Sequence, residues 1–195
     1  MMLDQIQTKM QYVCSNAAGP FDINFYDKHI CVMAEVADRL AQAFHADREV
    51  VALTSYLHDI SAIEDYAKVS QHHILGGDRA EEILSSLGYP NEKVAAIRQC
   101  ILTHSKPLAL GQGTLEEVCI SNADAASQIM MPGYWLHYAY TAKRLDYTNG
   151  LAWYTKMIGS HWNGMLEEAK SIAAEAYHAA CTLLKRESES IKSNG

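Results

Sequence analysis

The sequence predicts an all-α protein with a single domain. Apolar residues recur at helical spacing along most of the chain, and Gly and Pro stand where helices would end. With 195 residues, 49% hydrophobic and 20% charged, the chain is long enough for one packed core. It holds no internal repeat of the kind that builds a solenoid. We expect one domain over residues 1–186, followed by a polar tail over residues 187–195.

Two amphipathic helices are expected early in the chain. The first covers residues 21–44, with His29 near its start. Its apolar stripe consists of Ile30, Met33, Val36, Ala37, Leu40 and Ala41. The second covers residues 48–60 and ends on the doublet His58-Asp59. Because adjacent helical residues point about 100° apart, both doublet side chains reach one point most easily if this last turn loosens.

The segment after the doublet predicts a helix over residues 72–87, beginning at His72 or His73. Gly88 suits the left-handed conformation that ends a helix, and Pro90 blocks its continuation. In cyclic-di-GMP phosphodiesterases with a Gly-Tyr-Pro motif, that motif comes late in the domain. The triplet here is therefore interpreted as a helix stop.

The next two helices each carry one more polar candidate. The helix that begins with Asn91 as its N-cap ends near His104. After a loop over residues 106–113, Thr114 and Glu117 have the spacing of a capping box. This box predicts the start of the helix that carries Asp124.

Beyond residue 131 the composition becomes aromatic, and the aromatic residues still recur on helical periods. We expect two or three more helices over residues 134–186, packed on the half formed by residues 22–130. The aromatic run over residues 134–140 is expected to be core rather than a substrate site. Four histidines lack comparable neighbours and are expected to have ordinary roles: His45, His137, His161 and His178.

The charge and cysteine content exclude several classes of protein. Sixteen Lys plus Arg against 23 Asp plus Glu give a formal charge of −7, which argues against broad binding to nucleic acid or anionic membranes. No stretch approaches about 18 apolar residues, and the N-terminus lacks a cationic signal sequence. We expect a soluble, cytoplasmic protein. The five cysteines are odd in number and lack paired spacing, so reduced thiols are expected.

Six polar residues combine imidazole with carboxylate in a fixed order along the predicted helices. They are His29, His58, Asp59, His72, His104 and Asp124. Imidazole and carboxylate together suit Fe, Mn, Co, Ni or Zn, with Mg also possible, whereas calcium prefers oxygen ligands and structural zinc prefers sulfur. One such histidine alone is more often structural. The ordered set favours a metal centre used for chemistry.

This series, with its apolar surroundings, resembles the HD superfamily of metal-dependent phosphohydrolases, named for its His-Asp doublet. The resemblance covers about residues 22–130 and implies an HD-type helical bundle. It implies a basic metal site formed by His29, His58, Asp59 and Asp124. It also implies a second metal held by His72 and His104, with Asp59 as the catalytic, bridging ligand. His72 is preferred to His73 because it precedes Gly76 by four residues, as in the family's phrase.

The resemblance implies hydrolysis of a phosphomonoester or phosphodiester of a nucleotide or similar small metabolite by water that the metals activate. The sequence lacks a Gly-x-Ser-x-Gly elbow, a phosphate-binding P-loop and a cysteine phosphatase loop, so no protein nucleophile is expected. Arg79, Lys68 and Lys106 are candidates for contacts with a substrate phosphate. Solvated surface charges are an equally good interpretation of all three.

Two other functions stay open from the sequence. Some HD-superfamily members use the same six ligands to bind two irons and cleave a carbon bond with dioxygen, so a diiron oxygenase is the main alternative. A regulatory binding module that keeps the fold without the reaction is the second, although neither the doublet nor the final aspartate is missing. The sequence leaves the oligomeric state open.

Overall fold

The structure is a computed structural model that describes residues 2–193, with side chains for residues 2–190. Its described part is helical and contains no strand, which confirms the all-α prediction. The α-helices are α1 (Met2–Ser15), α2 (Ile23–Phe25), α3 (Cys31–Phe44), α4 (Arg48–Leu57), α5 (Ile60–Glu64), α6 (His72–Ser86), α7 (Asn91–Thr103), α8 (Leu115–Met130), α9 (Pro132–Thr141), α10 (Tyr147–Gly164) and α11 (Glu167–Ser193). A π-helical turn, η1 (Tyr26–Ile30), and a 3-10 helix, η2 (Tyr66–Gln71), complete the set.

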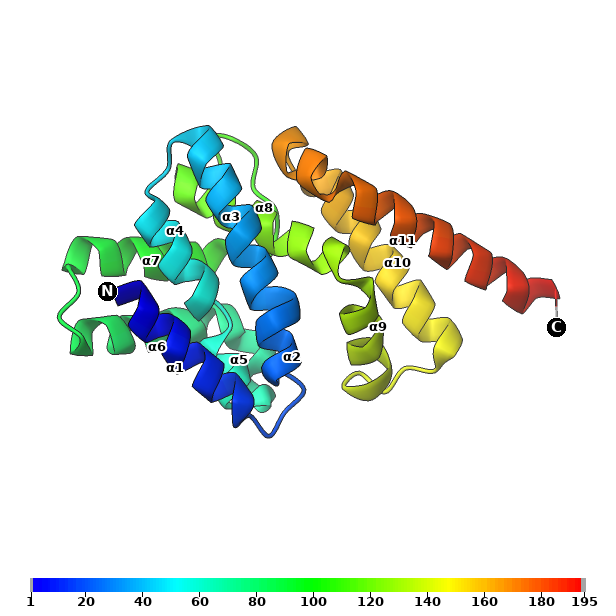
Figure 1. Cartoon of the computed structure of the whole chain (residues 1–195), viewed down its shortest axis with the longest axis horizontal. Helices are drawn as coiled ribbons and strands as arrows, with labels where there is room; N and C mark the ends of the chain where they lie inside the picture. The colour runs from blue at the N-terminus through cyan, green and yellow to red at the C-terminus, as the bar shows by residue number, and fades with distance from the viewer. Residues whose placement is uncertain (1, 194–195) are drawn as a thin grey trace.

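The helices form two groups that share α8. Figure 1 shows α1 to α7 gathered on one side of the molecule and α9, α10 and α11 on the other. Helix α8 contacts α3, α4 and α7 in the first group and α10 and α11 in the second. Most of its side chains are therefore buried, including that of Asp124.

The predicted helix over residues 21–44 is divided into three pieces. Asp22 caps the short helix α2, because its carboxylate accepts hydrogen bonds from the backbone N–H groups of Asn24 and Phe25. The π turn η1 follows and contains His29. A π turn holds one residue more than an α turn, and it carries no strong sequence signal. Periodicity alone therefore predicted one continuous helix.

The doublet forms the loosened turn that the sequence predicts. Helix α4 ends at Leu57, His58 occupies the C-cap, and Asp59 has φ −106° and ψ 10°, outside the helical region. Helix α5 then starts at Ile60. The break separates the directions of the His58 and Asp59 side chains from the regular helical spacing.

The other predicted helix ends are mostly confirmed. Gly88 has φ +71°, as the helix stop requires. Thr114 and Glu117 form both hydrogen bonds of the capping box. The prediction of Asn91 as an N-cap is wrong, because Pro90 occupies that position and its fixed φ starts the helix.

Three helices follow residue 131, at the upper end of the expected number. Helix α11 continues to Ser193, past the expected start of the polar tail at residue 187. The rest of that tail, residues 194–195, lies outside the described residues.

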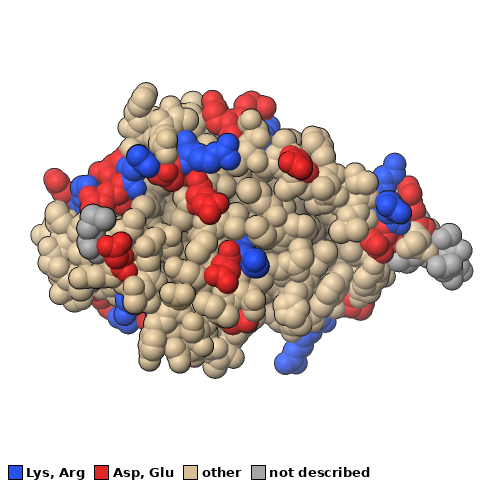
Figure 2. Space-filling model, viewed as in Figure 1, with Lys and Arg blue, Asp and Glu red and all other residues tan. Residues whose placement is uncertain are grey.

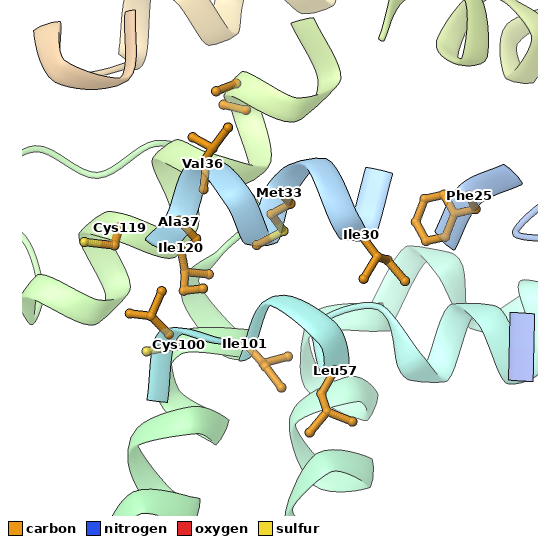
Figure 3. Close-up of a cluster of buried hydrophobic side chains, with 14 of the residues drawn as sticks. Phe25, Ile30, Met33, Val36, Ala37, Leu57, Cys100, Ile101, Cys119 and Ile120 are labelled. Carbon is orange, nitrogen blue, oxygen red and sulfur yellow. The ribbon is translucent and has the colours of Figure 1, made fainter. Parts of the chain in front are cut away.

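One hydrophobic cluster joins the helices around the doublet. Every residue of the predicted stripe on α3 and the end of η1 is buried. Figure 3 shows how side chains from α3, α4, α7 and α8 meet, and it labels Phe25, Ile30, Met33, Val36, Ala37, Leu57, Cys100, Ile101, Cys119 and Ile120. The packed side chains hold the ends of α4 and α7, where His58 and His104 lie, against η1.

The surface and the thiols agree with the composition. On the face shown in Figure 2, acidic and basic side chains are interspersed, so this face has no broad basic patch. All five cysteines are free thiols, as predicted. Among the described helices, none has both the length and the apolar character needed to cross a membrane.

Gly76 allows α6 to approach the doublet closely. A Cβ atom at this position would lie 2.9 Å from the backbone oxygen of His58, closer than carbon and oxygen can pack. The hydroxyl of Ser61 also donates a hydrogen bond to the backbone oxygen of His72, at 3.2 Å. These contacts fix α6, and with it His72, against the turn that carries the doublet.

Gly76→Ala should therefore force α6 away from His58 and lower the free energy of unfolding of the metal-free protein by roughly 1–3 kcal/mol. The matched control is Gly159→Ala in α10, where a Cβ would meet no atom within 4 Å. This control should be neutral or stabilising by up to about 1 kcal/mol. Urea unfolding of both variants measures the difference, and equal stability of Gly76→Ala and wild type would contradict the close contact.

Candidate metal centre

Four imidazole rings from separate parts of the chain converge in two pairs. His29 from η1 and His58 from the turn after α4 have their Nε2 atoms 3.1 Å apart. His72 at the start of α6 and His104 just after α7 also have their Nε2 atoms 3.1 Å apart. His29, His58 and His104 are buried, and His72 is half-buried.

Three of the rings are oriented by the same local device. In each, Nδ1 lies within hydrogen-bond distance of the backbone oxygen three residues earlier. The bonds join His58 to Ser55 (3.0 Å), His72 to Val69 (2.7 Å) and His104 to Ile101 (2.6 Å). Because a carbonyl oxygen only accepts, Nδ1 carries the proton in each ring, and a neutral ring presents an Nε2 lone pair.

His29 reaches the same state through a side chain of α8. Its Nδ1–H donates to the hydroxyl of Ser127 at 3.0 Å, because that hydroxyl itself donates to the backbone oxygen of Asp124 at 2.7 Å. In their neutral forms, the four rings therefore bring Nε2 lone pairs face to face in both pairs. Two acceptors 3.1 Å apart repel each other unless a proton or a cation lies between them, so this donor set fits a metal ion.

The carboxylate of Asp59 lies between the two pairs. Its Oδ2 is 3.1 Å from Nε2 of His58 and 3.8 Å from that of His29. Its Oδ1 is 3.5 Å from Nε2 of His72 and 4.0 Å from that of His104. Two groups of three ligand atoms, each within 4.8 Å of one another, result from this arrangement, and both include Asp59.

Asp124 lies beside the first pair. Its Oδ1 is 3.3 Å from Nε2 of His29, although it belongs to neither three-residue group. Both of its oxygens accept from the side-chain amide of Gln128, at 3.0 and 3.1 Å. The amide oxygen of Gln128 in turn accepts from Nε2 of His161, at 3.1 Å. A chain of hydrogen bonds thus links Asp124 to α10.

The expected ordinary role of His161 is therefore wrong. Its only signal in the sequence is a polar residue on a largely apolar helix, and its partner Gln128 gives a clearer one. Gln128 stands four residues after Asp124, on the same face of α8, where it can reach the carboxylate. Ser127 stands three residues after Asp124 and was missed in the same way.

Burial and charge move the pKa values of these groups in opposite directions. Burial lowers the pKa of His29 to about 4 and that of His104 to about 3. Burial also disfavours the charged form of His58, but nearby carboxylates, chiefly Asp59, outweigh it and raise the pKa to about 9. Burial opposes ionisation of Asp59, and the surrounding imidazoles, His58 first, more than offset it and hold its pKa well below the usual range.

A cavity of about 310 Å³ opens beside this cluster. Of the six candidate residues, all except His58 line it. Trp135 and Tyr138 also line it, together with Lys143 and Trp153. The expectation that residues 134–140 are core is thus correct only in part, because Trp135 and Tyr138 are buried and also face the cavity.

None of the three basic residues singled out in the sequence is among the described residues that line this cavity. The guanidinium of Arg79 is held by Glu64 and Glu82, with N–O distances of 3.0 Å. Lys106 is exposed on the loop after His104, and Lys68 lies 3.7 Å from a carboxylate oxygen of Asp65. These contacts favour their interpretation as surface charges.

His73, the alternative to His72, belongs to neither group of potential ligands. Its ring lies next to that of His72, with centroids 5.6 Å apart, while the Nε2 of His72 points to His104. The structure thus brings His72 to the cluster rather than its neighbour.

Solved structures with the same fold cover nearly the whole chain. A predicted HD superfamily hydrolase from an uncultured Thermotogales bacterium has a TM-score of 0.65 and 18% identity, covering 96% of this chain and 92% of its own. Bacillus subtilis YpgQ has a TM-score of 0.70 and 17% identity, covering 97% and 95%. YpgQ in complex with ADP has a TM-score of 0.70 and 18% identity, covering 97% of both chains.

Comparisons of sequence give the family. An uncharacterized protein of Clostridium beijerinckii is 30% identical over 79 residues, which are 40% of this chain and 50% of the relative. The match thus spans about half the length of that curated relative. The model of the HD domain matches residues 26–128, from η1 to the end of the network around Asp124. Because this match covers more than half of the sequence, the chain belongs to the HD domain family.

Proposed function

We propose that this protein is a metal-dependent phosphohydrolase that acts on a phosphomonoester or phosphodiester of a nucleotide or small metabolite. Its family supports metal-dependent hydrolysis as the general class of reaction. The observation that carries the proposal is the position of Asp59, whose two carboxylate oxygens face two separate pairs of histidine nitrogens. Such a carboxylate suits a bridge between two ions.

The proposed ligands divide between two ions. The first ion would be held by His29, His58, Asp59 and Asp124, and the second by Asp59, His72 and His104. When bound, such ions lower the pKa of a water ligand toward neutrality and polarise a phosphoryl oxygen. The hydrogen bonds from Nδ1 of all four rings keep the Nε2 atoms aimed at the ions, and the amide of Gln128 holds Asp124 in place.

The cavity supports a small phosphorylated substrate. Its volume of about 310 Å³ is at the lower end of the range of small-molecule sites. Lys143 brings a positive charge to its wall, apart from the histidines. The fold is shared with YpgQ, for which a complex with ADP is known. These observations favour an anionic substrate of limited size.

Elemental analysis should find about two transition-metal ions per chain in protein loaded with Mn²⁺. Asp59→Asn should lose most of this metal, because the shared ligand weakens both ions at once. Asp27→Asn, an exposed carboxylate two residues from His29, is the control and should keep both ions. Full metal content in Asp59→Asn would contradict the bridging role.

The two adjacent histidines test the second ion separately. His72→Ala should reduce the metal content to about one ion per chain, since it removes a proposed ligand of the second ion only. His73→Ala removes a neighbouring imidazole that lies outside both groups, and it should leave two ions. Equal metal content in the two variants would reduce the proposal to a single ion.

Metal binding should release about one proton at pH 7. The raised pKa of His58, about 9, means that this ring is charged in the metal-free protein, whereas His29 and His104 are already neutral. An ion that takes the Nε2 of His58 displaces its proton, so the apparent affinity should rise with pH until about 9 and then level. Calorimetry at pH 7 in buffers of different ionisation enthalpy measures the release, and an enthalpy independent of buffer would contradict it.

Metal-free protein should not hydrolyse p-nitrophenyl phosphate or bis(p-nitrophenyl) phosphate, and Mn²⁺, Co²⁺, Ni²⁺ or Mg²⁺ should restore hydrolysis. Hydrolysis that survives exhaustive chelation would overturn the proposed mechanism. Iron-loaded protein assayed for dioxygen uptake separates this proposal from a diiron oxygenase. Uptake of dioxygen without metal-dependent phosphate release would favour the oxygenase.

A further inference from the structure

Part of the cavity wall lies outside the region that defines the family. The HD domain match ends at residue 128, whereas Trp135, Tyr138, Lys143 and Trp153 come from α9, α10 and the turn between them. We infer that Lys143 binds a second anionic group of the substrate, apart from the phosphate held at the metal centre. This inference rests on the proposed function and makes Lys143 a specificity-determining residue of the same site.

Two aromatic rings hold the ammonium group of Lys143. Its Nζ lies 5.3 Å from the ring centroid of Trp153 and 6.0 Å from that of Tyr138. Contacts of this length are attractive because the face of an aromatic ring is electronegative. The hydroxyl of Tyr138 is itself within 2.8 Å of the hydroxyl of Tyr66 on η2, which ties this part of the wall to the family region.

The backbone turn at the end of α9 fixes the root of the lysine side chain. The N–H of Lys143 donates to the backbone oxygen of Tyr138 at 3.1 Å, and that of Leu145 donates to Ala139 at 3.1 Å. Arg144 between them has φ +54°, a conformation that non-glycine residues adopt at a cost. The chain therefore keeps a strained helix end that places Lys143 beside the cavity.

The charge of Lys143 is not neutralised within the protein. No carboxylate of the described residues forms an ion pair with it, whereas Arg79 and Lys93 each pair with two. The aspartates that line the cavity, Asp59 and Asp124, both belong to the metal centre. A cation beside aromatic rings in a partly enclosed cavity attracts an anion more strongly than a cation in open water.

A second hydrogen-bond donor of the same wall also lacks a partner. Nε1 of Trp135 is buried and has no acceptor among the described residues, although the side chain is 7% exposed and lines the cavity. Leaving a buried donor unpaired is costly, so such a group is usually satisfied by a ligand or an ordered water. An ammonium and an unpaired indole N–H on one wall suit a ligand that is rich in oxygen.

The substrate class follows from these groups. It is a compact phosphoester that carries a second anion, a carboxylate or another phosphate, separated from the scissile phosphate by an apolar or aromatic part. The rings of Trp153 and Tyr138 would contact that part. The family's metal ligands would then act on the phosphate, and the C-terminal helices would select what the phosphate is attached to.

A matched pair of substrates tests this inference on the metal-loaded protein. Phenyl phosphate and 4-carboxyphenyl phosphate differ only in the second anion, and the quantity measured is the ratio of their kcat/KM values. Lys143→Met, which keeps an apolar side chain against the rings, should lower the ratio for the carboxylated substrate by about tenfold. A purely structural role of Lys143 would lower both values equally and leave the ratio unchanged, which would overturn the inference.

The control is Lys156→Met, an exposed lysine on α10 that does not line the cavity. It removes the same charge from the same part of the molecule and should leave the ratio within about twofold. An equal drop in both variants would indicate general electrostatics and would also overturn the assignment.

Failure of the proposed function is distinguishable from failure of this inference. If wild type hydrolyses neither substrate, the phosphohydrolase proposal fails. Binding of phenylphosphonate and 4-phosphonobenzoate to the Mn²⁺-loaded protein, measured by calorimetry, then tests Lys143 alone. The affinity ratio should fall about tenfold in Lys143→Met. An unchanged ratio would refute the second-anion site.

Discussion

Burying a carboxylate costs several kcal/mol unless cations or hydrogen-bond donors surround it, and Asp59 is only 9% exposed. The rest of the site is arranged around this charge. The turn between α4 and α5 puts His58 next to it, η1 and the ends of α6 and α7 bring three more rings, and Gly76 lets α6 come close enough. The backbone carbonyls that orient the rings require helix ends, where such oxygens are free of helical partners. Helix breaks therefore coincide with the polar cluster.

Helix α8 connects this charge to the half of the molecule that forms the cavity wall. One face of the helix carries Asp124, Ser127 and Gln128, which contact His29 and His161 from the two sides. Its other faces pack into the cores of both helix groups. Movement of α10 against α8 would therefore change the hydrogen bonds of Asp124, and the shape of the cavity and the polar cluster are mechanically linked.

The sequence predicted the features that depend on local pattern. The apolar stripe of α3, the helix stop at Gly88, the capping box at Thr114 and the loosened turn at the doublet are all confirmed. Each rests on residues within a few positions of one another. Helix α1 was not assigned, and the π turn was missed, because neither has a strong local signal of this kind.

The contributions of the C-terminal helices could not be predicted, for a related reason. Trp135 and Trp153 recur on helical periods like ordinary core residues, and only the packing of α9 and α10 shows that they also border a cavity. Lys143 stands in a polar turn, where lysine is common. The ordered ligand series, by contrast, could be put forward from sequence because its residue types and their neighbours are unusual together.

The π turn that carries His29 makes the polar cluster sensitive to chain length as well as to residue type. Five residues, Tyr26–Ile30, occupy this wider turn, and an ordinary α turn would accommodate one fewer. Deleting one residue there would rotate everything on its N-terminal side by about 100° relative to α3, with all six polar residues still present in the same order. Sequences of this type can thus keep a perfect motif and still lose its geometry, so the spacing between Asp22 and Cys31 carries information that residue identities do not.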